Sequence, residues 1–238
     1  MKILVSEVQE HWPELERSLG HTFQNKALLA EALTHRSFAN EYHAENLPDN
    51  ERLEFLGDAV LDLVISEYLM VNLPEAPEGQ LTRIRADVVS MPGLARLACS
   101  LDIGSAMLLG RGERRSGGRE KSSLLADAVE SLIGAVFTDG GFAAAKAVIL
   151  PLFVPMIEEA SRLENQDFKS RLQEFLQSSQ RALPVYVLVE TTGPAHERTF
   201  RVDVMVDETV ISSGRGRSKK IAEQAAAEMA LTVLNDDT

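Results

Sequence analysis

The chain has 238 residues, enough for one or two domains with real hydrophobic cores. With 45% hydrophobic and 25% charged residues, and no run of about 18 apolar residues, it does not read as a membrane-spanning protein. The net charge of −12 excludes a uniformly basic surface. The start of the chain turns acidic at once and lacks the blocks of a secretory signal, so we expect a cytoplasmic location. The one cysteine, Cys99, excludes an internal disulfide, and its apolar neighbours predict a buried position.

From about residue 14 to residue 160, apolar residues recur at spacings of three and four, which predicts helices almost throughout. Glycine and proline clusters predict breaks at residues 74–79, 92–93, 110–118 and 139–141. We therefore expect residues 1–160 to form an all-α domain. The polar stretch that follows loses the apolar rhythm, which predicts a linker at residues 161–166.

Four acidic residues share one stripe of the first strongly predicted helix, NERLEFLGDAVLD at residues 50–62. They are Glu51, Glu54, Asp58 and Asp62. The opposite side is expected to be apolar and comprises Leu53, Leu56, Val60, Leu63 and Val64. Like charges at these spacings destabilise a helix, and a partly buried carboxylate needs a cation or hydrogen-bond donors. A divalent metal ion would explain the stripe.

A second helical segment, SSLLADAVESLIGAVF at residues 122–137, carries Asp127 and Glu130 three positions apart. The residues beside them on that face are small: Ser123, Ser131 and Gly134. Small neighbours allow another helix to approach closely, so the two acidic stripes could form one pocket. Oxygen-only ligands suit Mg²⁺ or Mn²⁺ rather than zinc. The alternative is that these acids form the solvated face of ordinary amphipathic helices.

Beyond residue 166 the periodicity changes. A short helix is predicted at residues 168–179, three strands at 184–190, 197–207 and 208–214, and a final helix at 218–234. The order is α-β-β-β-α, which predicts a small α+β domain at residues 167–238. The acid is unevenly spread, since residues 1–166 carry a net charge of −10 and residues 167–238 only −2. A basic cluster without intervening acids comprises Arg215, Arg217, Lys219 and Lys220.

Three motifs of the helical domain resemble the signature of bacterial ribonuclease III: LTHRS at residues 33–37, ERLEFLGDAVL at 51–61 and ADAVESLIGAVF at 126–137. The resemblance extends from about residue 12 to residue 236 and includes an insert at residues 38–49 that shorter members lack. It implies a multidomain protein with an all-α endonuclease domain that dimerises and cleaves double-stranded RNA. The ends would carry 5′-phosphates and 3′-hydroxyls with short 3′ overhangs.

The resemblance also implies roles for individual acids. Glu54, Asp127 and Glu130 match the metal ligands of the family, and Asp58 matches the catalytic acid beside them. Glu130 would also belong to the catalytic set, together with two further acidic positions of the cleavage site, Glu51 and Glu78. Asp62 matches no catalytic position. For His35 and Arg36 we expect structural hydrogen bonds. The chemistry would be phosphodiester hydrolysis by two-metal-ion catalysis with Mg²⁺, for which Mn²⁺ could substitute.

The small domain resembles a double-stranded RNA-binding domain in KSRLQEFLQ (169–177), GPAHERTFRV (193–202) and GRGRSKKIAEQAAAEMAL (214–231). Such modules read the shape, 2′-hydroxyls and phosphates of A-form RNA. Minor-groove contacts are implied for Gln173, Glu174, Gly193, Pro194 and His196. Lys219 and Lys220 open the last helix, where the helix dipole favours phosphate, and Arg215 and Arg217 would widen that site. A second basic segment, with Arg111, Arg114, Arg115, Arg119 and Lys121, is either a phosphate contact or a basic loop without one.

We therefore predict a homodimeric, Mg²⁺-dependent endoribonuclease that processes ribosomal RNA precursors and some messenger and transfer RNA precursors. Two alternatives stay open from sequence. One is a protein that binds duplex RNA without cutting it, and the other is a helical metalloprotein that is not a nuclease and carries an accessory RNA-binding module.

Overall fold

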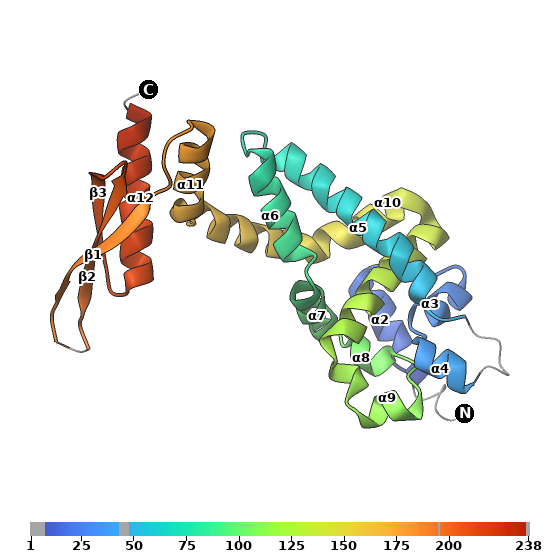
Figure 1. Ribbon diagram of the computed structural model, residues 1–238. Coiled ribbons are helices and arrows are strands. Elements are labelled where there is room, and N and C mark those ends of the chain that lie inside the picture. The colour runs from blue at the N-terminus through green and yellow to red at the C-terminus, as the bar shows by residue number, and fades with distance from the viewer. Residues whose placement is uncertain (1–7, 43–47, 195, 237–238) are drawn as a thin grey trace. The chain divides into compact units, whose positions relative to one another are not determined.

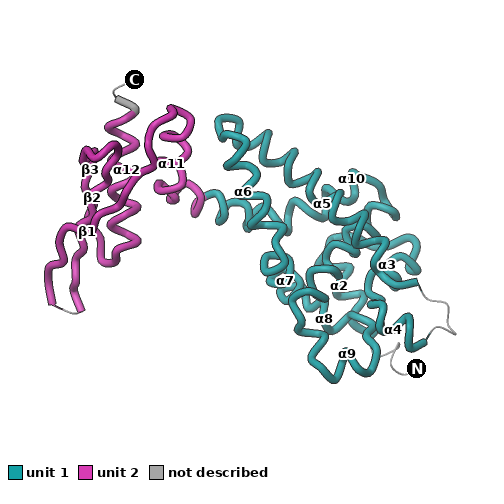
Figure 2. Tube along the Cα trace, viewed as in Figure 1, with its two compact units in different colours: residues 1–161 teal, residues 162–238 magenta. Residues whose placement is uncertain are grey.

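The computed structural model describes residues 8–42, 48–194 and 196–236, and the side chains of residues 235 and 236 are not described. The chain divides into two compact units, Met1–Ser161 and Arg162–Thr238 (Figure 2). The order of elements can be followed in Figure 1. Each unit has its own hydrophobic core of buried residues.

The described part of unit 1 is helical, apart from an isolated bridge between Thr34 and Leu108, as the apolar spacing predicts. Its helices before the long α10 are α2 (Trp12–Leu19), α3 (Lys26–Ala32), α4 (Arg36–Glu41), α5 (Glu51–Asn72), α6 (Glu78–Val88), α7 (Met91–Ser100), α8 (Ile103–Ala106), α9 (Arg111–Arg115) and the 3₁₀ turn η2 (Gly118–Glu120). The insert begins within α4, and its residues 43–47 lie outside the described residues.

Helix α5 is apolar on more than one side. Leu53, Val60 and Val64 are buried, as expected, but Leu63 is 57% exposed. Phe55 is 82% exposed on the same helix. Leu63 was expected on the buried face because the prediction assumed that α5 has one apolar face. The helix has a second apolar face, which is exposed.

Helix α10 (Ser122–Asn165) is two helices that meet at Gly141, whose φ of 74° and ψ of −173° are not helical. The predicted break at residues 139–141 is therefore present. The segment expected to be a linker is helical up to Asn165. Its Arg, Leu and Glu residues are good helix formers, so the helix continues without an apolar stripe.

By length and composition alone, α10 is also apolar enough to cross a membrane, with 28% of its most apolar window buried. The helix contains no unbroken apolar run of that length because Asp139 and Lys146 interrupt it. A single such helix is weak evidence, since the core helix of a soluble protein passes the same test.

Cys99 is exposed in the last turn of α7, so the prediction of a buried thiol was wrong. The apolar residues around it do predict the buried face of α7, where Leu97 and Ala98 lie. Cys99 itself falls on the other face of the helix. Proximity in sequence to apolar residues does not decide burial within a helix; the 3.6-residue period does.

Unit 2 contains α11 (Phe168–Ser178), the strands β1 (Val185–Thr192), β2 (Thr199–Val206) and β3 (Thr209–Gly216), and α12 (Lys219–Asp236). The strands form an antiparallel sheet in the order β1-β2-β3, so the α-β-β-β-α prediction is confirmed. The alanine-rich α12 packs against the sheet through Ala222, Ala226 and Ala230, which are fully buried. A Cβ on Gly214 would lie 2.2 Å from Ala226 N, so glycine and alanine together set this close packing.

Candidate metal centre and RNA-binding surface

Helices α5 and α10 cross at two glycines. A Cβ on Gly57 would lie 1.7 Å from the carbonyl oxygen of Glu130, and one on Gly134 would lie 2.1 Å from that of Leu53. Side chains larger than hydrogen at these positions would collide with backbone, which cannot move aside cheaply. The small residue at Gly134 was expected to permit close approach; Gly57 is its counterpart, which sequence analysis did not single out. The crossing brings the two acidic stripes within reach of each other.

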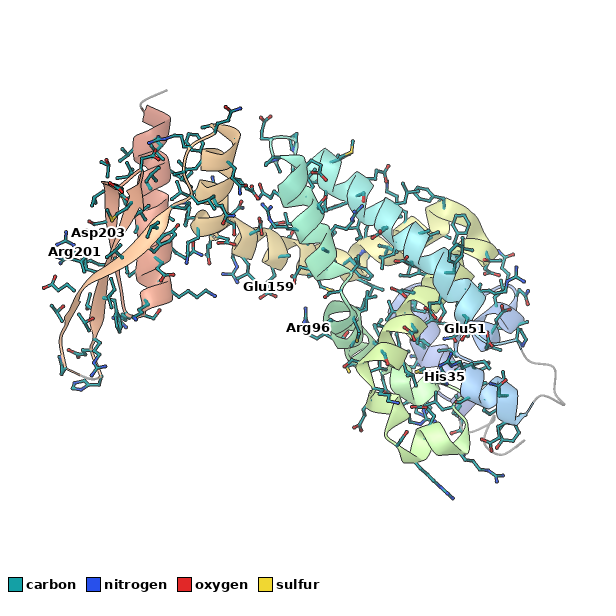
Figure 3. All side chains as sticks on the ribbon, in the orientation of Figure 1. His35, Glu51, Arg96, Glu159, Arg201 and Asp203 are labelled. Atoms are coloured by element: carbon teal, nitrogen blue, oxygen red, sulfur yellow. The ribbon has the colours of Figure 1, made fainter. Side chains whose placement is uncertain are left out.

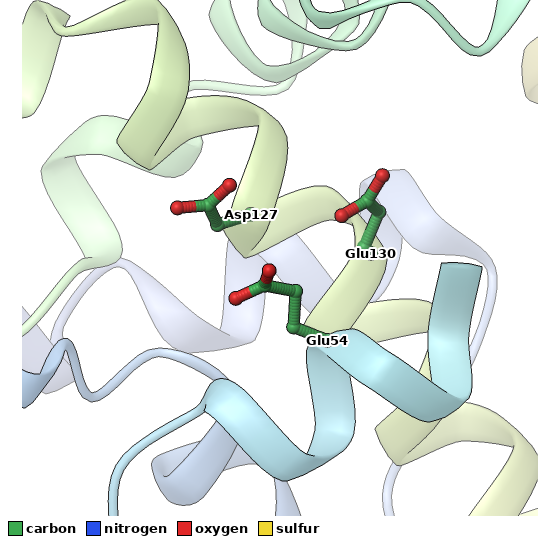
Figure 4. Close-up of side chains that lie close together, drawn as sticks. All are labelled: Glu54, Asp127 and Glu130. Carbon is green, nitrogen blue, oxygen red and sulfur yellow. The ribbon is translucent and has the colours of Figure 1, made fainter.

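Three carboxylates meet beside this crossing (Figure 4). One oxygen from each of Glu54, Asp127 and Glu130 lies within 4.8 Å of the others, and all three residues are half-buried. Glu54 comes from α5, and the other two residues come from α10. Among the described residues this is the one group of three or more acidic, histidine or cysteine side chains close enough to hold a metal ion.

The electrostatics of the three acids reflect burial and mutual repulsion. Burial and, to a smaller extent, the nearby charges of Asp58, Glu54 and Asp127 together raise the pKa of Glu130 to about 7. The pKa of Glu54 is raised by burial and then by Asp127, Glu51 and Asp58. Burial also raises the pKa of Asp127, against the opposing influence of His35 and Arg36. Three oxygen ligands that are held together against their own repulsion suit a hard divalent cation. The acidic cluster is thus compatible with a divalent metal site.

The other predicted acids lie around or away from the three. Asp58 is exposed and close enough to raise the pKa of both Glu54 and Glu130. Glu51 is exposed and accepts a hydrogen bond from Arg36 Nη1 at 3.3 Å. Glu78 lies in the first turn of α6 and accepts from Thr82 Oγ1 at 2.8 Å, and no described contact joins it to the three acids. Asp62 Oδ1 lies 3.9 Å from Arg85 Nε.

The LTHRS segment has structural roles, as expected. His35 caps the start of α4, where its Nδ1 accepts a hydrogen bond from Ser37 N at 3.2 Å. Arg36 pairs with Glu51, and Figure 3 places His35 and Glu51 in the same region of unit 1. The pKa of His35 is lowered by burial, which keeps the imidazole neutral near pH 7.

Several basic side chains of the segment at residues 111–121 make contacts within unit 1. Arg111 Nε lies 3.2 Å from Glu41, and Lys121 Nζ lies 2.7 Å from Glu113. Arg119 donates to the carbonyl oxygen of Gly104. Arg111, Arg114 and Arg115 line an open hollow on the surface. The segment is therefore an ordered basic surface rather than a free loop.

In unit 2 the predicted RNA contacts are exposed and lie on α11, in the turn between β1 and β2, and from the end of β3 to the start of α12. Gln173 and Glu174 lie on α11. Lys219 and Lys220 are the first two residues of α12. They follow the N-cap residue Ser218, whose Oγ accepts a hydrogen bond from Ile221 N at 3.2 Å. Gly193, in the turn between β1 and β2, has a φ of 89°, a conformation that favours glycine. Pro194 precedes Ala195, which lies outside the described residues.

An open groove beside that turn is lined by His196–Phe200 and Arg217. His196 and Arg217, which were assigned to different RNA contacts, are therefore brought together, and Arg198 joins them without having been singled out. Its signal in the sequence was only its place within the motif GPAHERTFRV. Arg215 lies elsewhere: it is exposed on β3 opposite Arg201 of β2, which pairs with Asp203 at 3.6 Å (Figure 3).

Comparison with known proteins matches both units. Residues 25–157 match the family described as Ribonuclease-III-like, and residues 168–234 match the double-stranded RNA binding motif. Ribonuclease 3 of Syntrophotalea carbinolica is 52% identical over 223 residues, covering 93% of this chain and 96% of the relative. Ribonuclease 3 of Caldanaerobacter subterraneus subsp. tengcongensis is 48% identical over 221 residues, covering 92% and 96%. The nuclease domain of ribonuclease III from Campylobacter jejuni matches with 45% identity and a TM-score of 0.55, covering 60% of this chain and 95% of that one.

A helical domain that gathers carboxylates at a glycine crossing, joined to a double-stranded RNA-binding module, defines a nuclease directed at duplex RNA. The chain belongs to the bacterial ribonuclease III family and is an endoribonuclease specific for double-stranded RNA.

Proposed function

We propose that this enzyme hydrolyses the phosphodiester bonds of duplex RNA by two-metal-ion catalysis in a site built on Glu54, Asp127 and Glu130. The observation that carries the proposal is the approach of their oxygens to within 4.8 Å across the α5–α10 crossing. Mg²⁺ is the proposed ion, with Mn²⁺ as a substitute, because both prefer oxygen ligands. Divalent ions bound here would supply positive charge for the phosphate oxygens and for an attacking water.

The three acids hold the ion and control its binding through their protons. Glu130, with a pKa of about 7, is partly protonated at neutral pH without metal and has to release that proton to act as a ligand. Binding of a cation also relieves the repulsion that raises the pKa of Glu54. Metal affinity is therefore expected to rise with pH through neutrality.

The acids around the three ligands are proposed to assist the attacking water and the cleavage of the phosphodiester bond. Asp58 is exposed beside the ligands, so it can take a proton from water and pass it to solvent. Glu51, oriented by Arg36, is a supporting acid of the cleavage site. For Glu78, which accepts a hydrogen bond from Thr82 of its own helix, we propose a role in the same cleavage site.

We propose that residues 167–238 bind the RNA duplex and that residues 1–160 cleave it. Gln173, Glu174, Gly193, Pro194 and His196 would contact the minor grooves, and Arg215, Arg217, Lys219 and Lys220 the phosphates. The exposed position of the charged members supports this assignment, because cations bind phosphate only where both can meet.

We further propose that the enzyme is a homodimer. Phe55, Leu63 and Met70 of α5 are 82%, 57% and 68% exposed, and large apolar side chains that gather on one helix usually mark an interface. The Campylobacter jejuni nuclease domain is described as having a region involved in dimer formation. Two subunits would each cut one strand, leaving 5′-phosphate and 3′-hydroxyl ends with short 3′ overhangs. Ribosomal RNA precursors and some messenger and transfer RNA precursors in the cytoplasm are the proposed substrates.

The test is a labelled RNA duplex incubated with the protein and Mg²⁺, and in parallel with EDTA. We expect defined duplex fragments with Mg²⁺ and intact RNA with EDTA. Replacing Mg²⁺ with Mn²⁺ should restore cleavage. Duplex that is bound but intact under every metal condition would contradict the proposal and favour a binding protein that does not cleave.

A further inference from the structure

Three buried polar residues meet where α3, α5 and α10 come together. Thr34, Asn50 and Ser131 have exposed fractions of 0%, 2% and 0%, and they are the buried polar residues of the part of the chain that the structure describes. Burying a polar group lowers the stability of the fold unless the group is hydrogen-bonded. The hydrogen bonds of these three residues therefore indicate what the cluster does.

Their hydrogen bonds join both ligand-bearing helices to one short segment. Ser131 Oγ, on α10, lies 2.8 Å from the carbonyl oxygen of Ala32, to which it donates. The backbone N–H of Asn50, at the start of α5, donates to the carbonyl oxygen of Thr34 at 2.9 Å. Asn50 Nδ2 then donates to Ser131 Oγ at 3.4 Å and links the two helices directly.

These anchors adjoin the metal-site acids in sequence. Ser131 follows Glu130, and its hydroxyl restricts rotation of α10 at that residue. Asn50 precedes Glu51, and its carbonyl oxygen accepts from Glu54 N at 2.9 Å in the first turn of α5. The glycine crossing sets how closely the helices approach, whereas this network fixes how each helix is turned at the crossing.

We propose that Ser131 and Asn50 are positioning residues that hold Glu130 and Glu54 at the separation needed to bind a divalent ion. The proposal rests on the proposed function, since it assigns a purpose to the separation of those carboxylates. Without such anchors, carboxylates that repel each other would turn apart whenever the ion leaves. Groups that orient metal ligands from behind commonly affect metal affinity or activity about 10- to 100-fold.

The central variant is Ser131→Ala, with Thr138→Val as its matched control. Thr138 lies on the same helix, and its hydroxyl donates to the carbonyl oxygen of Gly134 at 2.8 Å without reaching α5 or the Ala32–Thr34 segment. Each change removes one hydroxyl from α10. We expect Ser131→Ala to weaken Mn²⁺ binding about tenfold, and Thr138→Val to change it less than about twofold.

Mn²⁺ binding is measured on the full chain without RNA, by electron paramagnetic resonance of free Mn²⁺, beside the thermal midpoint of each variant. The Mg²⁺ concentration for half-maximal cleavage should rise in parallel, while duplex affinity without metal stays unchanged. Equal Mn²⁺ affinity in Ser131→Ala and Thr138→Val would overturn the proposal and leave the network a purely structural role. Wild-type protein that binds Mn²⁺ but does not cut RNA would refute the nuclease mechanism and leave the positioning test intact.

Two further variants guard against a folding defect. Ser131→Cys keeps a weak donor of similar size and should recover part of the Mn²⁺ affinity that alanine loses. Asn50→Ala combined with Ser131→Ala should bind Mn²⁺ about as well as the weaker single variant, because both act through one network. Losses that multiply in the double variant, with no recovery in Ser131→Cys, would contradict a shared positioning role.

Discussion

The two units use charge in opposite ways. In the helical unit, Glu54, Asp127 and Glu130 are half-buried at a helix crossing. Burial, together with the nearby charges of Asp58, Glu54 and Asp127, raises the pKa of Glu130 to about 7. In the small unit, Lys219 and Lys220 are exposed side chains in the first turn of α12. Catalysis needs charges concentrated and partly desolvated, whereas recognition of a polyanion needs them spread over an accessible surface.

This difference predicts how each unit responds to change. A site held by a crossing of two helices fails as a whole when a ligand or the crossing is altered. A surface made of separate cations loses affinity one contact at a time. Substitutions in the two units should therefore differ in the size of their effects, with the largest at the metal ligands.

Replacing Glu130 with alanine should abolish cleavage, by about a thousandfold or more, because a metal ligand is removed from the preorganised site. Duplex affinity should stay within about tenfold, since the RNA-binding unit is untouched. Cleavage rates and filter binding with labelled duplex measure the two effects. Asp62→Ala is the matched control: it removes an acid from the same face one turn beyond Asp58, and cleavage should persist. Retained cleavage in Glu130→Ala would show that the ligand assignment is wrong.

Gly57→Ala should separate the helices, because the added Cβ would lie 1.7 Å from the carbonyl oxygen of Glu130. Overpacking of this kind typically costs about 1–3 kcal/mol, and a collision with backbone lies at the upper end or beyond. We expect a large loss of thermal stability in unit 1 together with loss of cleavage. Gly112→Ala provides the control, since nothing lies within 4 Å of its Cβ. If Gly57→Ala unfolded no earlier than Gly112→Ala, the crossing would not depend on glycine.

Lys219→Ala combined with Lys220→Ala should weaken duplex binding by about 10- to 100-fold at moderate salt, and each lost phosphate contact should reduce the slope of log affinity against log salt by about one. Cleavage at saturating RNA should change little, because the carboxylate site is intact. Binding isotherms at several salt concentrations measure the slope. Lys146→Ala, which removes a cation of unit 1 that pairs with Glu67 at 2.6 Å, serves as control. An unchanged slope would remove these lysines from the phosphate contacts.

The acidic site was largely predictable from the sequence because it depends on helical period. Helical period places Glu54 in an acidic stripe of one helix, and it places Asp127 and Glu130 beside small residues on a face of another. The choice of these three acids as ligands came from the resemblance to bacterial ribonuclease III. The β-branched alternation likewise predicted the three strands of unit 2. The two errors in burial have different causes: Leu63 lies on a second apolar face of α5, whereas Cys99 lies on the exposed face of α7, where the helical period puts it.

The rest depended on contacts between segments far apart in sequence. Gly57 meets the backbone of Glu130, and Ser131 reaches Ala32 across 99 positions. The local pattern marks Ser131 only as a small residue beside the acids and does not mark Gly57, so neither contact can be read from it. Arg198 joined the groove for the same reason: the fold of the β1–β2 turn, not the spacing of the motif, brings it beside Arg217.

The smallest effect concerns stability without metal. The carboxyl of Glu130 has a pKa of about 7 in the folded protein against an ordinary value of 4.5. Between these values the folded state binds more protons than the unfolded state, so the contribution of Glu130 to stability falls as pH rises from about 4.5 to about 7 and then stays low. Glu130→Gln removes the charge and keeps the shape. In EDTA at pH 8 it should be more stable than wild type, by about 1 kcal/mol after allowance for partial exposure, or about 2–4 °C in midpoint.

That advantage should shrink as the pH is lowered towards 5, where wild-type Glu130 is protonated and uncharged. Saturating Mg²⁺ should reverse the order at pH 8, since a bound ion stabilises only the protein that retains its ligand. Thermal midpoints across this pH range, with EDTA and with Mg²⁺, measure both effects, and Glu67→Gln on the surface controls for loss of one charge. If Glu130→Gln were more stable than wild type by the same amount at pH 5 and pH 8, ionised Glu130 would not destabilise the folded protein. The helical unit would then not differ from the RNA-binding unit in this respect.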